Sequence, residues 1–263
     1  MNAYDLPDEL QVSADGPVRI ITLNRPEQLN ATNHDLHRGL AALFPQIDSD
    51  DEARAAVITG AGRAFSAGGD FNYIDELSKD AALRARTLAH GRQIVTGMVR
   101  CRVPIVAAVN GPAVGLGCSL VALSDIVFMA ESAHLADPHV LLGLVAADGG
   151  PVVWPMLTSL QLAKEYALTG ERIPAQRAAD IGLVNHVCAD GEVLDQALAC
   201  AQKIARLPKG AVEDTKRIIN IQMERAILAA LDFALTAEDR SFTTPELRAN
   251  VERALRPERD KAN

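Results

Sequence analysis

The chain has 263 residues, of which 48% are hydrophobic and 4% aromatic, and its formal net charge is −8 at pH 7. This length fits one domain with a buried, mainly aliphatic core and a small appendage. The negative charge argues against nucleic acid or an anionic membrane as a partner, because both require a basic face. No apolar run reaches the roughly 18 residues that a membrane span needs, and no secretion signal is evident at the N-terminus.

The four cysteines form neither a C-x-x-C pair nor a spacing typical of metal ligands. Isolated cysteines of this kind behave as small hydrophobic residues. We therefore expect reduced thiols, no metal site and a cytoplasmic protein. The cysteines are Cys101, Cys118, Cys188 and Cys200.

The first half of the chain alternates predicted strands with predicted helices. Strands are expected at residues 18–23, 55–59, 104–109 and 125–130. An amphipathic helix is expected at 33–44, entered through Thr32 or Asn33, and the polar stretch 71–100 also permits helix. Elements of these lengths in this order imply right-handed βαβ crossovers and an α/β fold.

The second half is predicted to be mainly helical. Residues 136–151 carry glycines without clean periodicity, and helices are expected beyond them, at residues 160–168, 175–181, 192–206 and 210–237. Pro208-Lys209-Gly210 is the expected hinge. We therefore divide the chain into a core, residues 1–207, and a C-terminal helical region, residues 208–263.

Two glycine turns follow two of the predicted strands. Residues 64–70 read Ala-Phe-Ser-Ala-Gly-Gly-Asp, and residues 110–119 read Asn-Gly-Pro-Ala-Val-Gly-Leu-Gly-Cys-Ser. Glycine permits backbone conformations and close approaches that other residues resist. Two such turns at the ends of adjacent strands can aim two backbone N–H groups at one point, as in an oxyanion hole.

These turns, together with Leu-Asn-Arg-Pro at 23–26 and Leu-Thr-Gly at 168–170, resemble the enoyl-CoA hydratase/isomerase (crotonase) superfamily. The resemblance runs from about residue 18 to residue 187. It implies a crotonase-like spiral of ββα and βαβ units with a helical C-terminal trimerisation region. It also implies an acyl-CoA thioester substrate, with coenzyme A as part of the substrate and no covalently bound cofactor. The expected assembly is a homo-trimer or a dimer of trimers, and the expected setting is fatty acid metabolism.

The resemblance also assigns residues to the site. It makes the N–H groups of Gly69 and Leu116 the oxyanion hole, and places the backbone of Ala67 near the adenine of coenzyme A. Arg25 is a candidate for phosphate contacts. Asp70 lies beside the substrate region, where an aspartate before a helix is expected to cap it.

The sequence then departs from the family pattern. Hydratases of this family carry two glutamates that hold a water molecule and move its proton. Ser119 stands at the first of these positions and His139, after Asp137-Pro138, at the second. Histidine titrates near neutral pH, whereas serine does not act as a base alone.

The remaining candidate carboxylate is Asp148, in the segment Ala-Ala-Asp-Gly-Gly at 146–150. Some branches of the family place a single catalytic carboxylate at or next to this point, although Asp148 also suits the N-cap of a following helix. The family geometry would bring Ser119, His139 and Asp148 to the rim of one pocket, where they could act as nucleophile, base and orienting group. Trp154 is a candidate wall of the acyl pocket.

Three functions stay open at this point. The leading hypothesis is an acyl-CoA lyase or isomerase that forms a thioester enolate through a non-standard active site. The second is a hydrolase of a thioester or of a carbon–carbon bond between two carbonyls, with His139 and Asp148 activating water. The third is a non-catalytic acyl-CoA-binding protein. A hydrogen bond between His139 and Asp148 would favour the hydrolase, and an isolated Asp148 facing the acyl site would favour the isomerase.

Overall fold

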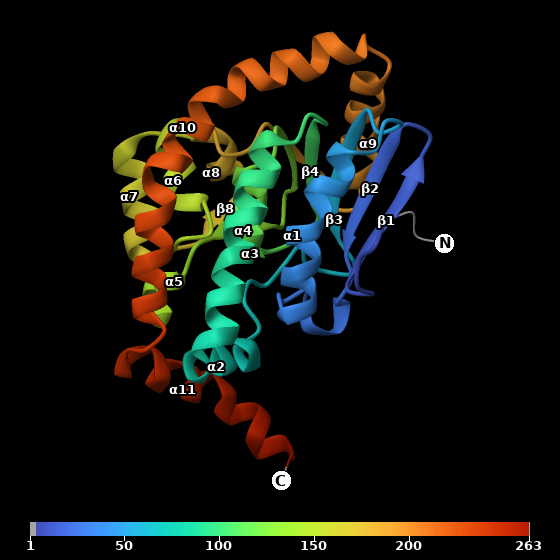
Figure 1. Ribbon diagram of the computed structural model, residues 1–263. Helices are drawn as coiled ribbons and strands as arrows, with labels where there is room; N and C mark the ends of the chain where they lie inside the picture. The colour runs from blue at the N-terminus through green and yellow to red at the C-terminus, as the bar shows by residue number, and fades with distance from the viewer. Residues whose placement is uncertain (1–3, 263) are drawn as a thin grey trace.

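The protein is built around a six-stranded sheet, seen in a computed structural model that describes residues 4–262, with side chains up to residue 256 (Figure 1). The strand order is β1-β2-β3-β4-β6-β9; β1 and β2 are antiparallel, and every other neighbouring pair is parallel. The strands are β1 (Leu10–Asp15), β2 (Val18–Leu23), β3 (Ala55–Gly60), β4 (Ile105–Val109), β6 (Ile126–Ala130) and β9 (His186–Cys188).

Both faces of the sheet centre are covered. All six residues of β3 are buried, and successive side chains enter different apolar clusters. Ile58 packs in the cluster that contains Phe44 of α1 (His34–Asp48) and Ile94 of α3 (Ala81–Arg100). Val57 packs in the cluster formed with α9 (Val193–Ala205). The parallel strands are therefore apolar on both sides, as expected for βαβ units.

A second, smaller sheet connects the second glycine turn, residues 110–119, with the second half of the chain. It has the order β5-β7-β8, formed by β5 (Ala113–Val114), β7 (His134–Ala136) and β8 (Ile173–Pro174). Short helices surround it: α4 (Leu116–Ala122), α5 (His139–Leu142), α6 (Gly150–Leu157), α7 (Leu160–Thr169) and α8 (Ala175–Asp180). A single 3₁₀ turn at Pro26–Gln28 follows β2.

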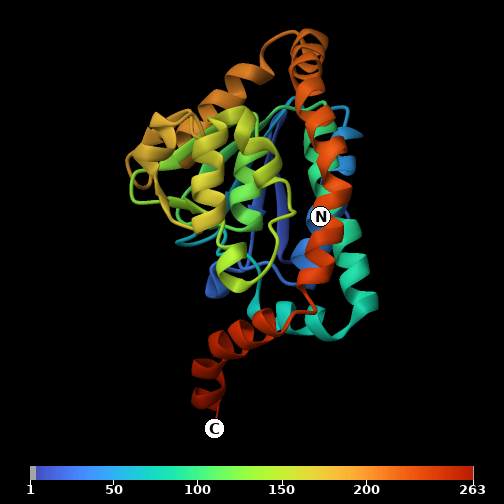
Figure 2. The same ribbon diagram turned by 90° about the vertical axis from the view of Figure 1, so that its left-hand side faces the viewer.

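Two helices close the chain, α10 (Lys209–Ser241) and α11 (Pro245–Ala262). The long helix α10 runs alongside α3 in both views and also packs on α6 (Figures 1 and 2). Helix α11 packs on α5 and on α2 (Phe71–Lys79), and its end projects from the molecule. No helix within residues 4–262 is both long enough and apolar enough to span a membrane.

The predicted strand at 18–23 and the alternating α/β order are confirmed. The stretch 71–100 forms two helices rather than one, because the Asp80 carboxylate accepts the N–H groups of Ala82 and Leu83 and starts a second helix there. Helix α11 lies within the C-terminal region, residues 208–263, that was expected to be helical. The strands that were not predicted are β1, β5, β7, β8 and β9. All four cysteines are free, as expected.

Candidate active site

The candidate site is a cavity of about 450 Å³ between the glycine turns and the helices α2, α3, α10 and α11. Its wall is mainly apolar, with Phe71 and Ile74 from α2 and Leu235 and Phe242 at the end of α10. Polar groups reach it from several directions. They are His37, Arg84, Thr87, His139, Asp148, Glu238 and Arg253. An apolar cavity with a few converging polar groups is the usual form of a small-molecule site.

The two glycine turns pack against each other at one edge of this cavity. The Ser66 N–H donates to the Pro112 carbonyl at 3.0 Å, and the Val114 N–H donates to the Ser66 carbonyl at 2.9 Å. Gly68 has φ +90°, and a Cβ there would lie 3.1 Å from the Val114 carbonyl oxygen. Glycine is needed at this position because both the backbone angle and the close approach exclude a side chain.

Gly69 and Leu116 both line the cavity, one from each turn. Neither backbone N–H group donates a hydrogen bond to any acceptor in the described residues, 4–262. Leu116 is the first residue of α4, where helix N–H groups have no partner within the helix. Two unpaired N–H groups beside one cavity are available to a bound oxygen atom.

Asp148 lies in the loop before α6 and lines the cavity. Ser119 on α4 donates its hydroxyl to Asp148 Oδ1 at 2.6 Å and accepts the Gly150 N–H at 3.2 Å. The second carboxylate oxygen, Oδ2, is buried and has no hydrogen-bond partner among residues 4–262. Ser119 therefore fixes one oxygen of Asp148 and leaves the other without a hydrogen bond.

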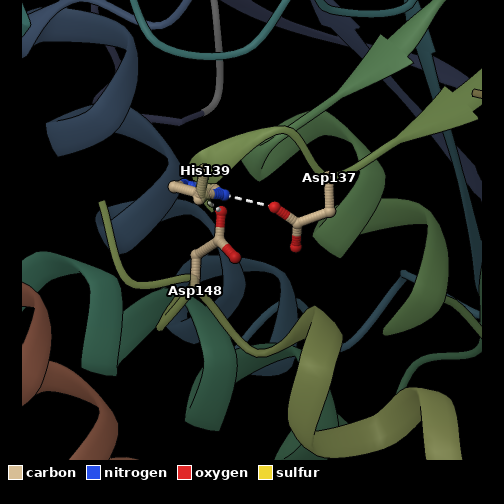
Figure 3. Close-up of side chains that lie close together, drawn as sticks. All are labelled: Asp137, His139 and Asp148. Atoms are coloured by element: carbon tan, nitrogen blue, oxygen red, sulfur yellow. Dashed lines mark hydrogen bonds and ion pairs between the residues drawn. The ribbon is translucent and has the colours of Figure 1, made fainter. Parts of the chain in front are cut away.

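His139 lies between two carboxylates, Asp137 and Asp148 (Figure 3). Its Nδ1 bonds to Asp137 Oδ1, and its Nε2 lies 3.8 Å from Asp148 Oδ2. The second distance is too long for a hydrogen bond. Asp137, rather than Asp148, therefore orients the imidazole ring.

The charges in this cluster set one another's protonation. Burial alone would lower the pKa of His139, but the carboxylates of Asp137 and Asp148 outweigh it and raise that pKa to about 10. Burial raises the pKa of Asp148, although His139 and the Ser119 hydroxyl oppose the change. At neutral pH His139 is an imidazolium held between two acidic groups.

The same three residues are the only group of metal-ligating type whose ligand atoms lie close together, within 4.8 Å, in the described part of the chain. A protonated imidazole has no free lone pair for a metal. Because His139 is protonated at neutral pH, the cluster suits a shared proton better than a bound cation.

A second group of histidines lies at the cavity wall. His37 of α1 lines the cavity, and its ring centroid lies 6.0 Å from that of His90 on α3. Burial, followed by repulsion from His90 and His34, lowers the pKa of His37 to about 3. His37 is therefore neutral at physiological pH.

The remaining predicted residues lie around this site in different ways. Ala67 lines the cavity, and its N–H donates to the Leu29 carbonyl at 2.9 Å. Asp70 caps α2 by accepting the Asn72 N–H, as expected. Arg25 bonds to Asp70 at 3.1 Å and lies outside the cavity lining, so it is already paired.

Two expectations about the cavity wall are not met. Trp154 is 1% exposed, belongs to the main core and is not among the residues that line the cavity. Ser119 is fully buried behind Asp148 and does not reach the rim. The expected Ser-His-Asp series is not formed, because Ser119 bonds to the carboxylate and not to the imidazole.

The sequence did not reveal Asp137 or Glu238. Asp137 immediately precedes Pro138 and His139, and its role depends on a local bend that brings residues two apart together. Glu238 lies in a long polar helix with no motif around it. Only the packing of α10 across the cavity identifies it.

The comparisons with known proteins all identify the same family. Residues 14–258 match the family model described as enoyl-CoA hydratase/isomerase. The chain is 33% identical over 233 residues to the short-chain-enoyl-CoA hydratase of Clostridium acetobutylicum, with 88% of each chain covered. It is 36% identical over 224 residues to the 2,3-dehydroadipyl-CoA hydratase of Escherichia coli, covering 85% of this chain and 86% of that protein.

A solved structure is similar over almost the whole length. The crystal structure of an enoyl-CoA hydratase/isomerase from Mycobacterium paratuberculosis has a TM-score of 0.94 and 65% identity, covering 95% of this chain and 100% of that chain. The range matched by the family model includes both glycine turns, His139, Asp148 and Glu238.

Proposed function

Since the chain belongs to the enoyl-CoA hydratase/isomerase family, we propose that it forms a thioester enolate from an acyl-CoA and moves protons on the acyl group with Asp148 and His139. Coenzyme A enters as part of the substrate. The observation that carries this proposal is Oδ2 of Asp148, which has no hydrogen-bond partner among residues 4–262 and belongs to a residue lining the same cavity as the unpaired N–H groups of Gly69 and Leu116.

The two N–H groups are assigned to the thioester oxygen. Removing a proton from Cα leaves a pair of electrons that becomes an enolate, with negative charge on that oxygen. Two N–H donors placed in advance stabilise this charge, and losing one such donor typically costs about 3–4 kcal/mol of transition-state binding. Leucine serves at position 116 as well as glycine because only its backbone takes part.

Asp148 is assigned as the base. A general base needs a free lone pair directed at the proton that it removes, and Asp148 keeps one while Ser119 holds the other oxygen. A raised pKa also makes this carboxylate a stronger proton acceptor. The His139 imidazolium adds a positive charge 3.8 Å away, which opposes the effect of burial and favours the ionised form of Asp148.

Proton transfer within the acyl group is better supported than standard hydration. Hydration in this family uses two glutamates on one water molecule, and Ser119 and His139 occupy those positions here. The fully buried Ser119 hydroxyl is committed to Asp148. The hydratase names of the relatives describe those proteins, and we propose that this chain hydrates crotonyl-CoA weakly or not at all.

The hydrolase is less well supported. It requires His139 to activate water with Asp148 orienting the ring, whereas the ring bonds to Asp137 and carries a proton at neutral pH. The non-catalytic binding protein is less well supported too, because His139 and Asp148 both line the cavity.

We also propose a homo-trimer or a dimer of trimers. Ile227, Leu231 and Leu235 of α10 face the core, but Ile218 and Ile219 are 69% and 67% exposed on the same helix. Exposed apolar side chains at neighbouring positions suit contact with another copy of the chain. Light scattering at micromolar concentration tests this, and a monomeric mass would contradict it.

The ligand class can be tested by thermal shift. A ligand that binds only the folded state raises the melting temperature, so acyl-CoA or coenzyme A should do so. No shift with any CoA species at millimolar concentration would rule out the CoA site.

The reaction can be tested with a panel of enoyl-CoA and acyl-CoA thioesters in D₂O, read by mass spectrometry. Enolate formation by Asp148 should introduce deuterium at Cα, because the base returns a solvent-derived deuteron. A panel in which no thioester gains deuterium or changes mass would refute the proposed function.

A further inference from the structure

Glu238 is a carboxylic acid that lines the cavity and has no part in the chemistry described so far. It lies on α10, and Leu235 and Phe242, about one turn before and after it, line the cavity as well. Residues spaced by three and four share one face of a helix. This face of α10 is therefore a wall of the cavity, on a different element from Asp148.

The backbone around Glu238 is held to the loop that carries Asp148. The Glu238 carbonyl accepts the Ser241 hydroxyl at 2.7 Å, and that hydroxyl in turn accepts the Val145 N–H at 3.2 Å. Val145 is three residues before Asp148. The segments that carry the carboxyl groups of Glu238 and Asp148 are thus held together by hydrogen bonds.

The Glu238 carboxyl itself has no hydrogen bond or ion pair with any side chain or backbone group described in the structure. Its neighbour Asp239, by contrast, is paired with Arg84 at 2.7 Å. Burial raises the pKa of Glu238 to about 8, with His139 opposing the shift and Asp148 adding to it. Glu238 is therefore protonated at neutral pH, and no group among the described residues accepts a hydrogen bond from its carboxyl.

Several charged and titratable groups surround Glu238. Those that interact with it electrostatically are His139, Asp148, Asp137 and Asp239. Other ionisable side chains on the cavity wall are His37, Tyr73, Arg84 and Arg253. His37 is neutral and Arg84 is paired, so the excess of acidic groups favours a protonated Glu238.

Resting on the proposed function, we propose that Glu238 is a second catalytic residue, which delivers a proton to Cγ of the acyl chain after Asp148 has taken one from Cα. The substrate class is then a 3-enoyl-CoA thioester, and the product is the conjugated 2-enoyl-CoA. The acid and the base come from different walls of one cavity, as the transfer of a proton between two carbon atoms two bonds apart requires.

The step balances without a co-reactant. The Asp148 carboxylate removes the Cα proton, and the electrons of that C–H bond form a dienolate with its negative charge on the thioester oxygen. As the oxygen returns its electrons, a double bond forms between Cα and Cβ, the old double bond opens, and Cγ takes the proton of Glu238. Asp148 is left protonated and Glu238 ionised. One proton exchanged with water at each group restores the enzyme.

The test separates the two halves of this reaction in the Glu238→Gln variant. Glutamine keeps the shape but has no proton to deliver, so conversion of a 3-enoyl-CoA to its conjugated isomer should fall about 10²-fold or more. Deuterium uptake at Cα from D₂O should continue, because it needs only Asp148 and the enolate. Retained exchange also shows that the variant is folded and binds its thioester.

The pH profile gives a further measurement. Wild-type isomerisation should fall above about pH 8, where Glu238 loses its proton, while Cα exchange should not follow that decline. Asp232→Asn is the matched control, since Asp232 is an exposed carboxylate on the same helix that pairs with Arg92 and lies outside the cavity lining. It should leave both reactions unchanged.

Each outcome decides the matter. If Glu238→Gln isomerises the thioester at the wild-type rate, the role of Glu238 is overturned and the proposed function stands. The same conclusion follows if the variant loses exchange and isomerisation equally. A wild-type protein that exchanges no proton on any thioester would overturn the proposed function and this inference with it. Should Glu238→Gln fail to fold, Glu238→Leu, which replaces an acid on the mainly apolar cavity wall with an apolar side chain, carries the same test.

Discussion

Two histidines that line one cavity have pKa values shifted in opposite directions. His139, bonded to Asp137 and 3.8 Å from Asp148, has its pKa raised to about 10. His37, next to His90, has its pKa lowered to about 3. Burial lowers the pKa of both, so the difference comes from the neighbours.

At neutral pH one cavity therefore holds a cationic imidazole, His139, and a neutral one, His37. Carboxylates beside a buried histidine stabilise its charged form, and other histidines disfavour it. The charged ring lies where the proposed chemistry needs an ionised Asp148. The neutral ring lies next to His90. The following experiments change one neighbour at a time.

The largest effect is expected from Asp148→Asn. The change keeps the shape and the Ser119 contact but removes the proton-accepting charge, so turnover should fall about 10²-fold or more. Coenzyme A binding should persist, because the assigned contacts come from backbone elsewhere. Steady-state kinetics and thermal shift measure the two. Rapid hydration of crotonyl-CoA by the wild type that neither Asp148→Asn nor His139→Ala affects would contradict the assignment.

Asp137→Asn should make His139 more like His37. Removing an adjacent opposite charge typically lowers a histidine pKa by about 1–3 units. The His139 ring should then lose its proton at a lower pH than in the wild type, as measured by NMR titration of the ring. An unchanged His139 titration would show that Asp137 does not control this charge.

His37→Gln should change the dependence of stability on pH. The folded-state pKa of His37, about 3, is below its value in the unfolded chain, so the unfolded state takes up a proton first as the pH falls. The contribution of His37 to stability is thus present above about pH 6.5 and declines below it, by at most about 1.4 kcal/mol per pH unit.

Denaturant unfolding at several pH values between about 7 and 4 measures this slope. The variant should lose stability less steeply than the wild type on acidification. His139→Gln provides the opposite case, because a raised folded-state pKa gives stability that is lost as the pH rises above about 6.5 towards 10. Equal slopes in wild type and His37→Gln would show that His37 is not held neutral by the fold.

Asp232→Asn is the control variant, with the smallest expected change in stability and in the histidine pKa values. Asp232 and Arg92 form an exposed pair on the outside of α10 and α3, with side chains 77% and 43% exposed. Exposed pairs contribute about 0–1 kcal/mol, so the free energy of unfolding should change by less than about 1 kcal/mol. The titrations of His139 and His37 should not move. A shift in either would mean that distant surface charge, rather than the adjacent groups, sets their pKa values.

Much of this site follows from local sequence. The strands that end in glycine turns could be predicted because β-branched runs and glycines act within a few residues, and the family resemblance placed Asp148 and His139 in one cavity. The protonation of His139 could not be predicted, since it depends on the bend that brings Asp137 back to the ring. Glu238 could not be predicted either, because 90 residues separate it from Asp148 and only the course of α10 brings it back to the cavity.

Helix α10 also constrains how this chain can change in length. Near its start Lys216 bonds to Asp125 at 2.7 Å and to the Val103 carbonyl at 2.9 Å, and Glu238 follows 22 residues later in the same helix. Each residue turns the helix by about 100° about its axis. One residue inserted or deleted between them would rotate Glu238 out of the cavity while Lys216 stayed in place. Homologues that keep this acid should therefore vary in the composition of this segment but not in its length.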